Sequence, residues 1–381
     1  MNQDLLIKCV ELQLDFPKGV PLSHNNLLSN IIQMVEAMSI TSEDVFVSWL
    51  PVYHDMGLIL NTMVPLYKGA VLVLLAEGLH KVHSWLKAIE QYKGTFISAP
   101  DIAYRLCVKS IRRPEDYNLS SLRVALNASE RIQLQTYQLF EDTFRLKNVM
   151  VSGYGLAEAT VAVTMHPPGQ PPVTDSDGYV ASGKPLQGID IKIDTKKNEK
   201  ANKNVGEILV SSSSLMKGYF NQQKSKNPFD AQGYLHTGDI GYLDQEINLY
   251  VLARKKNCIK HAGHTIYPDD VEQVVKSVEG VRQVAAVGVE SSSGNGESIY
   301  VFAESRVYRN HSMEKYHTLA VDIVRKINDH FGIRPGRVFL VKAKTLPGTP
   351  NGKMQHSLLK DIYQNHFPQI SENILYPKKF A

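Results

Sequence analysis

The chain has 381 residues, 43% of them hydrophobic and 21% charged, which are the values of an ordinary globular protein and argue against a disordered or fibrous one. Its 42 Lys and Arg against 38 Asp and Glu give a net charge of +4, too small and too evenly spread for a nucleic-acid-binding or anionic-membrane surface. Three cysteines without CxxC spacing indicate the reducing cytoplasm, and the longest apolar run, 70–76, is too short to span a membrane.

Helix and strand patterns alternate from residue 25 to about 165. An apolar face at helical spacing runs from Leu27 to Met38, with Ser23 or Asn25 as candidate N-cap. The strand patterns DVFVSWLP, AVLVLL, TFISAP and LRVALN are separated by the helix patterns KVHSWLKAIEQY, DIAYRLCVKSI and IQLQTYQLFEDTF. The uninterrupted run AVLVLL predicts a strand buried on both faces. The alternation predicts an α/β fold with a parallel sheet layered with helices.

The pattern changes after Thr164. HPPGQPP and TDSDG predict irregular structure, and the short strands GIDIKID, GEILVSS and NLYVLA predict a small antiparallel β subdomain. Beyond Arg254 the order helix, strand, strand, helix, strand predicts a compact α+β domain. We therefore expect three parts, 1–164, 165–254 and 255–381, the first a remnant of a larger α/β domain, with a hinge near Lys255 or Lys256.

Two glycine-containing turns after predicted strands carry candidate site residues, because loops at the ends of parallel strands commonly host sites. In LPVYHDMG the candidate is His54, and a polar turn without function is the alternative. In GYGLAE, Tyr154 lies beside Gly155, so its planar ring can stack on a base with little crowding. The Glu158 carboxylate can hold Mg²⁺, which prefers carboxylate and phosphate oxygens; a solvated glutamate in a first helical turn is the alternative.

Two later segments supply further charged groups. The LHTGD turn presents Asp239, whose carboxylate can accept two hydrogen bonds from a ribose diol, although a plain turn also explains so short a string. Arg254, one predicted strand later, offers a planar donor fork for hydroxyl or phosphate oxygens. LPGTPNGK ends in Lys353, which a mobile loop can carry to an oxygen where negative charge develops; an ordinary surface lysine is the alternative.

In this order the segments resemble the adenylate-forming superfamily of acyl-CoA synthetases, luciferases and peptide-synthetase adenylation domains. Within it, SWLPVYHDMGLI, APDIAYRLCVKSI, YGLAEAT and GHTIYPDDVE are most similar to fatty acyl-AMP ligases. The resemblance runs from about Phe16 to the C-terminal region. It implies that ATP and Mg²⁺ activate a fatty acid as acyl-AMP, and that the acyl group then passes to the thiol of an acyl carrier protein or, alternatively, of coenzyme A.

The resemblance also implies which residues contact the nucleotide. The ribose would lie against Asp239 and Arg254, and the magnesium ion against Glu158. The residues that would surround the adenine are Ala128, Ser129, Glu130 and Tyr154, and Gly155 would also contact the nucleotide.

Three further residues receive roles from the same resemblance. His54 would border the acyl and phosphate site, and Lys353 would be the lysine of the adenylation step. Lys256 would lie at the hinge about which a mobile C-terminal domain turns between adenylation and thiol transfer. A lysine on such a domain can be present for phosphate chemistry and absent afterwards.

The chain departs from the family pattern at two places. It keeps PKGV, Pro17–Val20, but reads CVELQLDF where a Ser/Thr/Gly-rich phosphate loop is expected, and a segment without glycine does not wrap phosphates easily. We expect either a truncated homologue that folds poorly, with an uncovered sheet edge and apolar faces, or a reading frame that starts upstream of Met1; a catalytically inactive homologue is the alternative function. The stretch between Thr164 and Ser182 is shorter than the insertion typical of fatty acyl-AMP ligases, which keeps coenzyme A open as acceptor.

Overall fold

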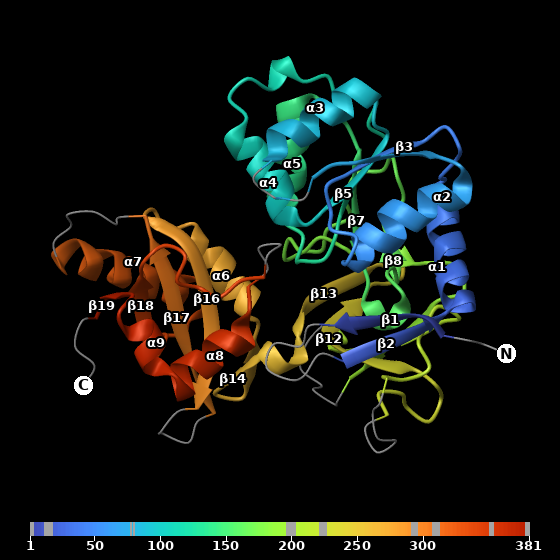
Figure 1. The fold of residues 1–381 in the computed structure, drawn as a ribbon. Helices are drawn as coiled ribbons and strands as arrows, with labels where there is room; N and C mark the ends of the chain where they lie inside the picture. The colour runs from blue at the N-terminus through green and yellow to red at the C-terminus, as the bar shows by residue number, and fades with distance from the viewer. Residues whose placement is uncertain are drawn as a thin grey trace. The chain divides into compact units, whose positions relative to one another are not determined.

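The computed structural model describes residues 4–10, 18–76, 78, 81–195, 203–220, 227–290, 296–306, 313–349 and 354–377, with the backbone alone for 4–10 and 368–369. The chain forms two compact units, which we call the large unit, ending at Val251, and the small unit, beginning at Leu252. Both can be followed along the chain in Figure 1. The predicted division into 1–164, 165–254 and 255–381 stays a prediction.

A seven-stranded sheet forms the centre of the large unit in the described part of the chain, in the order β4-β3-β5-β6-β7-β8-β9. Its strands are β3 (Val45–Ser48), β4 (Val71–Leu74), β5 (Phe96–Ala99), β6 (Val124–Asn127), β7 (Met150–Tyr154), β8 (Thr164–Met165) and β9 (Lys184–Pro185). The first five in spatial order are parallel, whereas β8 and β9 continue the sheet antiparallel. β5 and β6 are buried throughout, as uninterrupted apolar strands of a parallel sheet are. The predicted α/β class is confirmed.

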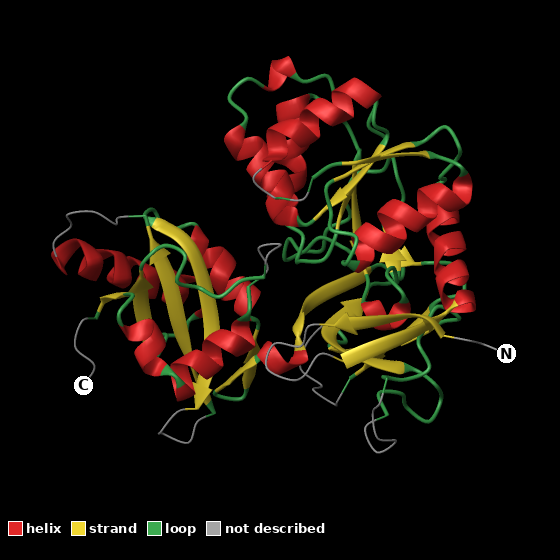
Figure 2. Cartoon of the chain, viewed as in Figure 1, coloured by secondary structure: helices red, strands yellow, loops and turns green. Residues whose placement is uncertain are grey.

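Helices cover both faces of this sheet. They are α1 (His24–Ala37), α2 (Val64–Lys68), α3 (Val82–Tyr92), α4 (Asp101–Ser110) and α5 (Leu134–Phe144), with a π-helix, η1 (Met56–Met63), before α2. Figure 1 shows α3, α4 and α5 on one side and α1 and α2 on the other, and Figure 2 shows the same layers by type of secondary structure. Of the two candidate caps of α1, Ser23 is the N-cap, since its side chain accepts from the Asn26 N–H at 3.2 Å.

The prediction that AVLVLL is buried on both faces is wrong. β4 is the edge strand of the sheet as far as the described residues show, and it pairs with β3 alone. Val71 and Leu74 are each 52% exposed, and Leu66 and Tyr67 of α2 are exposed as well. An apolar run therefore marked a parallel strand correctly, but the number of covered faces depends on neighbours that the run itself does not specify.

In the described part of the large unit, two further sheets are antiparallel. One has the order β10-β11-β12-β13, with β10 (Asp190–Asp194), β11 (Gly206–Ser211), β12 (Leu235–Leu243) and β13 (Leu249–Arg254), as the predicted β subdomain requires. The other pairs β1 (Asp4–Val10) with β2 (Lys18–Ser23). The segment CVELQLDF thus begins inside strand β1, and its remainder lies outside the described residues.

The small unit is an α+β sandwich. A four-stranded sheet, β16-β17-β18-β19, separates two helix pairs, and a hairpin and the 3₁₀ turn η6 (Lys255–Asn257) precede it. Its elements are β14 (Ile259–His261), β15 (His264–Ile266), α6 (Pro268–Lys276), β16 (Val281–Glu290), β17 (Glu297–Ser305), α7 (Met313–Phe331), β18 (Arg337–Val341), α8 (His356–Asn365), α9 (Phe367–Ser371) and β19 (Ile374–Tyr376).

The core of the small unit follows the period of two of its strands. In β16, Val284 and Ala286 pack on the side of α6 and α7, whereas Ala285 and Val287 pack on the side of α8 and α9. Alternate side chains of the strand thus belong to two separate apolar layers, one on each face of the sheet. Among the described helices of both units, none combines the length and the apolar character that crossing a bilayer requires.

Candidate functional site

One edge of the central sheet gathers most of the predicted site residues. β3, β5, β6 and β7 are parallel, so their carboxyl ends meet at one edge, where open α/β sheets bind ligands. His54 follows β3, the segment 128–130 follows β6, and Tyr154 ends β7. We call this the carboxyl edge of the sheet. Sequence segments up to about a hundred residues apart thus reach one region of the large unit.

A hydrogen bond joins two of these predicted residues directly. The Tyr154 hydroxyl donates to Asp239 Oδ2 at 2.6 Å across 85 residues of sequence. Asp239 is only 4% exposed, whereas the ring of Tyr154 is half-buried. A buried carboxylate beside a partly exposed ring is an arrangement that can receive a hydroxylated, planar ligand.

The LHTGD segment, predicted as a turn, lies in strand β12 instead. The register between β11 and β12 shifts between Glu207 and Leu209, and Gly238 adopts a φ of 73°, in the left-handed region that favours glycine. The Thr237 side chain accepts from the Asp239 N–H at 3.1 Å. The irregularity in the strand therefore holds Asp239 in place, as bulges beside sites commonly do.

Gly155 has a steric reason to be glycine. A Cβ at this position would lie 1.7 Å from the main-chain oxygen of Val161, which is far inside contact distance. The turn after Tyr154 therefore packs directly against the backbone that follows the short 3₁₀ helix η4 (Ala157–Ala159). This close approach fixes the direction in which the chain leaves β7.

Glu158 lies in η4 and is held by a neighbouring ring. The Tyr219 hydroxyl donates to Glu158 Oε1 at 2.7 Å, and the Met216 N–H donates to the Glu158 main-chain oxygen at 2.9 Å. In the described part of the chain, no hydrogen bond or ion pair engages Oε2. One oriented carboxylate oxygen fits Mg²⁺, which takes one or two protein carboxylates and completes its shell with phosphate oxygens and water.

His54 has a defined orientation at the start of η1. Its Nδ1 accepts from the Met56 N–H at 3.2 Å, so the neutral ring carries its proton on Nε2. Asn61 stabilises η1 from inside by donating to the Met56 oxygen and to Ser98 Oγ, both at 2.8 Å. A π-helix is uncommon and frequently accompanies functional sites.

The segment 128–130 contains a strained residue and an anchor. Ser129 has a φ of 74°, unusual for a residue with a side chain, and Glu130 Oε1 accepts from the Ile102 N–H at 3.3 Å. The sequence interpretation missed the group beneath this segment, the fully buried Asp101. A signal was present, because an aspartate directly after the apolar strand TFISAP occupies the same carboxyl edge.

The remaining predicted residues belong to the small unit or lie outside the described residues. The boundary between the units falls within β13, so Arg254, the last residue of that strand, counts with Lys256 in the small unit; both are exposed, and Lys353 lies outside the described residues. Next to them, Cys258 donates its thiol to the Arg254 main-chain oxygen at 3.4 Å, and burial raises the pKa of this thiol to about 11. The roles predicted for Arg254, Lys256 and Lys353 stay predictions.

Comparison with known proteins agrees with this architecture. Residues 16–220 match the model of the AMP-binding enzyme family, and residues 263–358 match that of the AMP-binding enzyme C-terminal domain. The chain is 32% identical to the protein Rv1013 of Mycobacterium tuberculosis, covering 90% of this chain and 68% of that protein.

Two further relatives are named for fatty-acid chemistry. The medium-chain-fatty-acid–[acyl-carrier-protein] ligase JamA of Moorena producens is 27% identical, over 90% of this chain and 64% of its own length. A structure from a study of fatty acyl-adenylate ligases from E. coli and L. pneumophila superimposes with a TM-score of 0.83 at 26% identity, covering 95% of this chain and 70% of that one. The chain spans about two thirds of the length of the curated relatives it matches, between 62% and 68% for the first four. With family models matched over more than half of its residues, this chain belongs to the AMP-binding enzyme family.

Proposed function

We propose that this chain activates a fatty acid with ATP as acyl-AMP and transfers the acyl group to the thiol of an acyl carrier protein. The observation that carries the proposal is the hydrogen bond between Tyr154 and Asp239, which unites the two segments that the resemblance assigns to adenine and ribose. Relatives named as fatty-acid ligases for acyl carrier protein support the substrate and the acceptor.

In the first step a carboxylate oxygen of the fatty acid attacks the α-phosphorus of ATP, and the bond to pyrophosphate breaks. The protein contributes mainly by orienting the reactants and stabilising charge on the phosphate oxygens. The half-buried Tyr154 ring offers a face to the adenine, beside the segment 128–130 and Gly155, and Asp239 accepts hydrogen bonds from the ribose hydroxyls.

Glu158 is the residue proposed to hold magnesium. When bound, Mg²⁺ would neutralise part of the charge on the phosphate oxygens. The Tyr219 hydroxyl donates to Oε1, and this hydrogen bond also fixes the orientation of Oε2. His54, with a proton on Nε2, is proposed to border the phosphate and acyl groups as a hydrogen-bond donor.

The small unit is proposed to supply the remaining charges. Arg254 would contact the ribose, and Lys353 would donate to the phosphate or carboxylate oxygens during adenylation. Lys256 would be the hinge of a rotation that exchanges adenylation for thiol transfer. The thiolate then attacks the acyl carbon, and AMP leaves as the mixed anhydride bond breaks. We place this chemistry in the cytoplasm, in line with the cysteine usage.

An inactive nucleotide-binding homologue is the second candidate. It is favoured by the segment CVELQLDF, which contains no glycine where the family's phosphate loop is expected, and whose first two residues, Cys9 and Val10, pair with β2 as the end of strand β1. Coenzyme A is the alternative acceptor within the first candidate.

Pyrophosphate release from Mg-ATP with a panel of fatty acids tests the proposal, with Asp239→Asn and Glu158→Gln as matched variants. We expect release that both variants lower, and acyl transfer to acyl carrier protein in preference to coenzyme A. ATP binding without release by any acid would establish the inactive homologue. A folded wild type that neither binds ATP nor releases pyrophosphate would exclude both.

A further inference from the structure

Beneath the carboxyl edge lies a carboxylate with no exposure to solvent. Asp101 is 0% exposed and is the first residue of α4, directly after β5 and Pro100. Burying a charge is costly unless it is paired and hydrogen-bonded, so each of its contacts matters to the fold around it.

Both oxygens of Asp101 are engaged. Oδ1 accepts from Asn127 Nδ2 at 2.9 Å and from the Gln133 N–H at 3.4 Å. Oδ2 accepts from the Thr136 hydroxyl at 3.1 Å and pairs with Arg105 Nε at 2.9 Å. Three of these partners come from one stretch of chain, which runs from the last residue of β6, Asn127, to the first turn of α5, where Thr136 lies.

These partners bracket the segment 128–130. Asn127 is the last residue of β6, and Gln133 is the N-cap of α5, whose side chain makes no capping bond. Asp101 therefore holds the connection where it leaves the sheet and again where it enters the helix. The neighbouring Ile102 N–H holds its middle through Glu130. The first turn of α4 thus holds the chain at Asn127, before the strained Ser129, and at Glu130 and Gln133, after it.

We propose that Asp101 is a positioning residue that fixes the loop 128–130 in the conformation that receives the nucleotide, which rests on the function proposed above. A carboxylate suits this role because it only accepts: it fixes the Asn127 amide with its nitrogen inward and takes the Gln133 and Thr136 donors at the same time. An amide in its place would turn a donor toward one of these donors.

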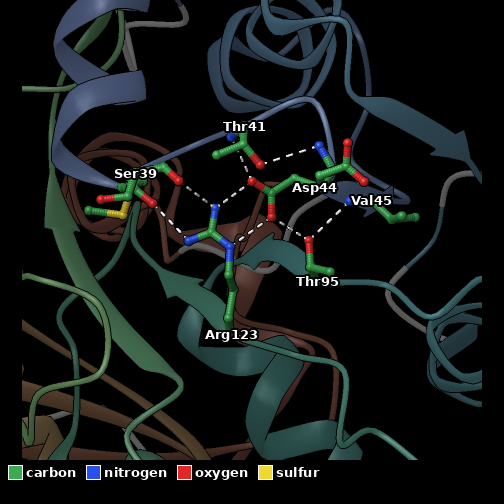
Figure 3. Close-up of polar contacts among 8 residues, drawn as sticks. Ser39, Thr41, Asp44, Val45, Thr95 and Arg123 are labelled. Carbon is green, nitrogen blue, oxygen red and sulfur yellow. Dashed lines mark hydrogen bonds and ion pairs between the residues drawn. The ribbon is translucent and has the colours of Figure 1, made fainter.

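The amino end of the same sheet offers a matched control. Asp44, 3% exposed, precedes β3 and also binds an arginine, a threonine hydroxyl and a main-chain N–H, as Figure 3 shows for Arg123, Thr95 and Thr41. In the described part of the chain, the side-chain hydrogen bonds and the ion pair of Asp44 go to Thr41, Thr95 and Arg123, and none goes to the loop 128–130. Asp44→Asn therefore reproduces the loss of a buried carboxylate in the same sheet without altering the loop.

The experiment compares Asp101→Asn, Asp44→Asn and the wild type by three measurements: the KM for ATP and for the fatty acid, the temperature of unfolding, and amide hydrogen exchange of residues 128–133 without nucleotide. Asp101→Asn should raise the KM for ATP about tenfold, with that for the acid changed less than about twofold, and speed exchange in 128–133. Asp44→Asn should lower the unfolding temperature without either effect.

Equal changes in both variants, or unchanged exchange and KM in Asp101→Asn, would overturn the proposal. If Asp101→Asn does not fold, Thr136→Val is tested instead, because it removes one hydrogen-bond donor to Asp101. Faster amide exchange of the loop in Thr136→Val, with the wild-type rate in Thr136→Ser, would support the positioning role of Asp101. Unchanged exchange in Thr136→Val would overturn it. Failure of the wild type to bind ATP or release pyrophosphate would instead refute the proposed function, while hydrogen exchange would still decide whether Asp101 fixes the loop.

Discussion

The two ends of the central sheet each bury an aspartate, but the two carboxylates hold different parts of the chain. Each end buries an aspartate beside an arginine, Asp44 with Arg123 at the amino end and Asp101 with Arg105 at the carboxyl edge. At the amino end the partners belong to the starts of strands β3, β5 and β6 (Figure 3). At the carboxyl edge Arg105 belongs to α4 itself, and the other partners lie between the end of β6 and the first turn of α5.

The difference lies in what each carboxylate immobilises. Arg123 also donates to the Met38 and Ser39 main-chain oxygens, so the network of Asp44 ties the end of α1 to the sheet. Asp101 instead orders a segment with a strained residue and an exposed surface. Similar pairs therefore stabilise the fold at one end and shape a candidate site at the other.

The largest effect is expected from breaking the amino-end network. Asp44→Ala leaves the partly buried guanidinium of Arg123 without its carboxylate, which should lower the free energy of unfolding by about 3 kcal/mol. Urea unfolding measures the loss. The KM for ATP of the folded fraction should stay at the wild-type value, and a clear rise in that KM would erase the contrast between the two ends.

Replacing each of the two arginines by leucine sharpens the comparison between the two ends of the sheet. Arg123→Leu removes bonds to Asp44 and to two main-chain oxygens, whereas Arg105→Leu removes a single ion pair from Asp101. We expect Arg123→Leu to cost about 2 kcal/mol of stability and Arg105→Leu about 1 kcal/mol, because both guanidinium groups are about one-third exposed. Only Arg105→Leu should weaken ATP binding, as calorimetric titration would show; the reverse order would contradict the assignment.

Acid titration isolates the charge of Asp44. Burial alone would raise the pKa of this carboxyl, but hydrogen bonds from Arg123, the Thr41 N–H and Thr95 hold it below its usual value. Its contribution to stability is therefore complete above the unfolded-state pKa of about 3.9 and is lost as the pH falls through the lower folded-state pKa. The stability of Asp44→Asn should fall less steeply than that of the wild type below about pH 4. Parallel curves for the two proteins would count against this.

The smallest effect is expected from an ion pair outside both networks. Lys87 and Glu90 pair at 2.8 Å on the exposed face of α3. Lys87→Ala should leave the unfolding midpoint and the KM for ATP unchanged within error, since solvent screens such pairs. If Lys87→Ala shifted the unfolding midpoint as much as Asp44→Ala, the stabilisation by an ion pair would not depend on its burial.

Part of the candidate site could be predicted from the sequence. Tyr154 and Asp239 were singled out from separate glycine-containing strings, and the structure places them in direct contact. Their hydrogen bond was not predictable, because it depends on the irregularity in β12 around Gly238, where the sequence suggested only a turn. Asp101 was overlooked because a single charged residue at the start of a helix usually interacts with the helix dipole at the surface.

By itself, the sequence determined the alternation of helices and strands and the family, since periodicity and motif order are carried by the residues themselves. Only the tertiary structure decided that β4 is an edge strand and that Asp101 lies beneath the loop 128–130. Both facts depend on which segments become neighbours in the sheet. That choice is made by burial and hydrogen bonding across distant parts of the chain, which no local pattern records.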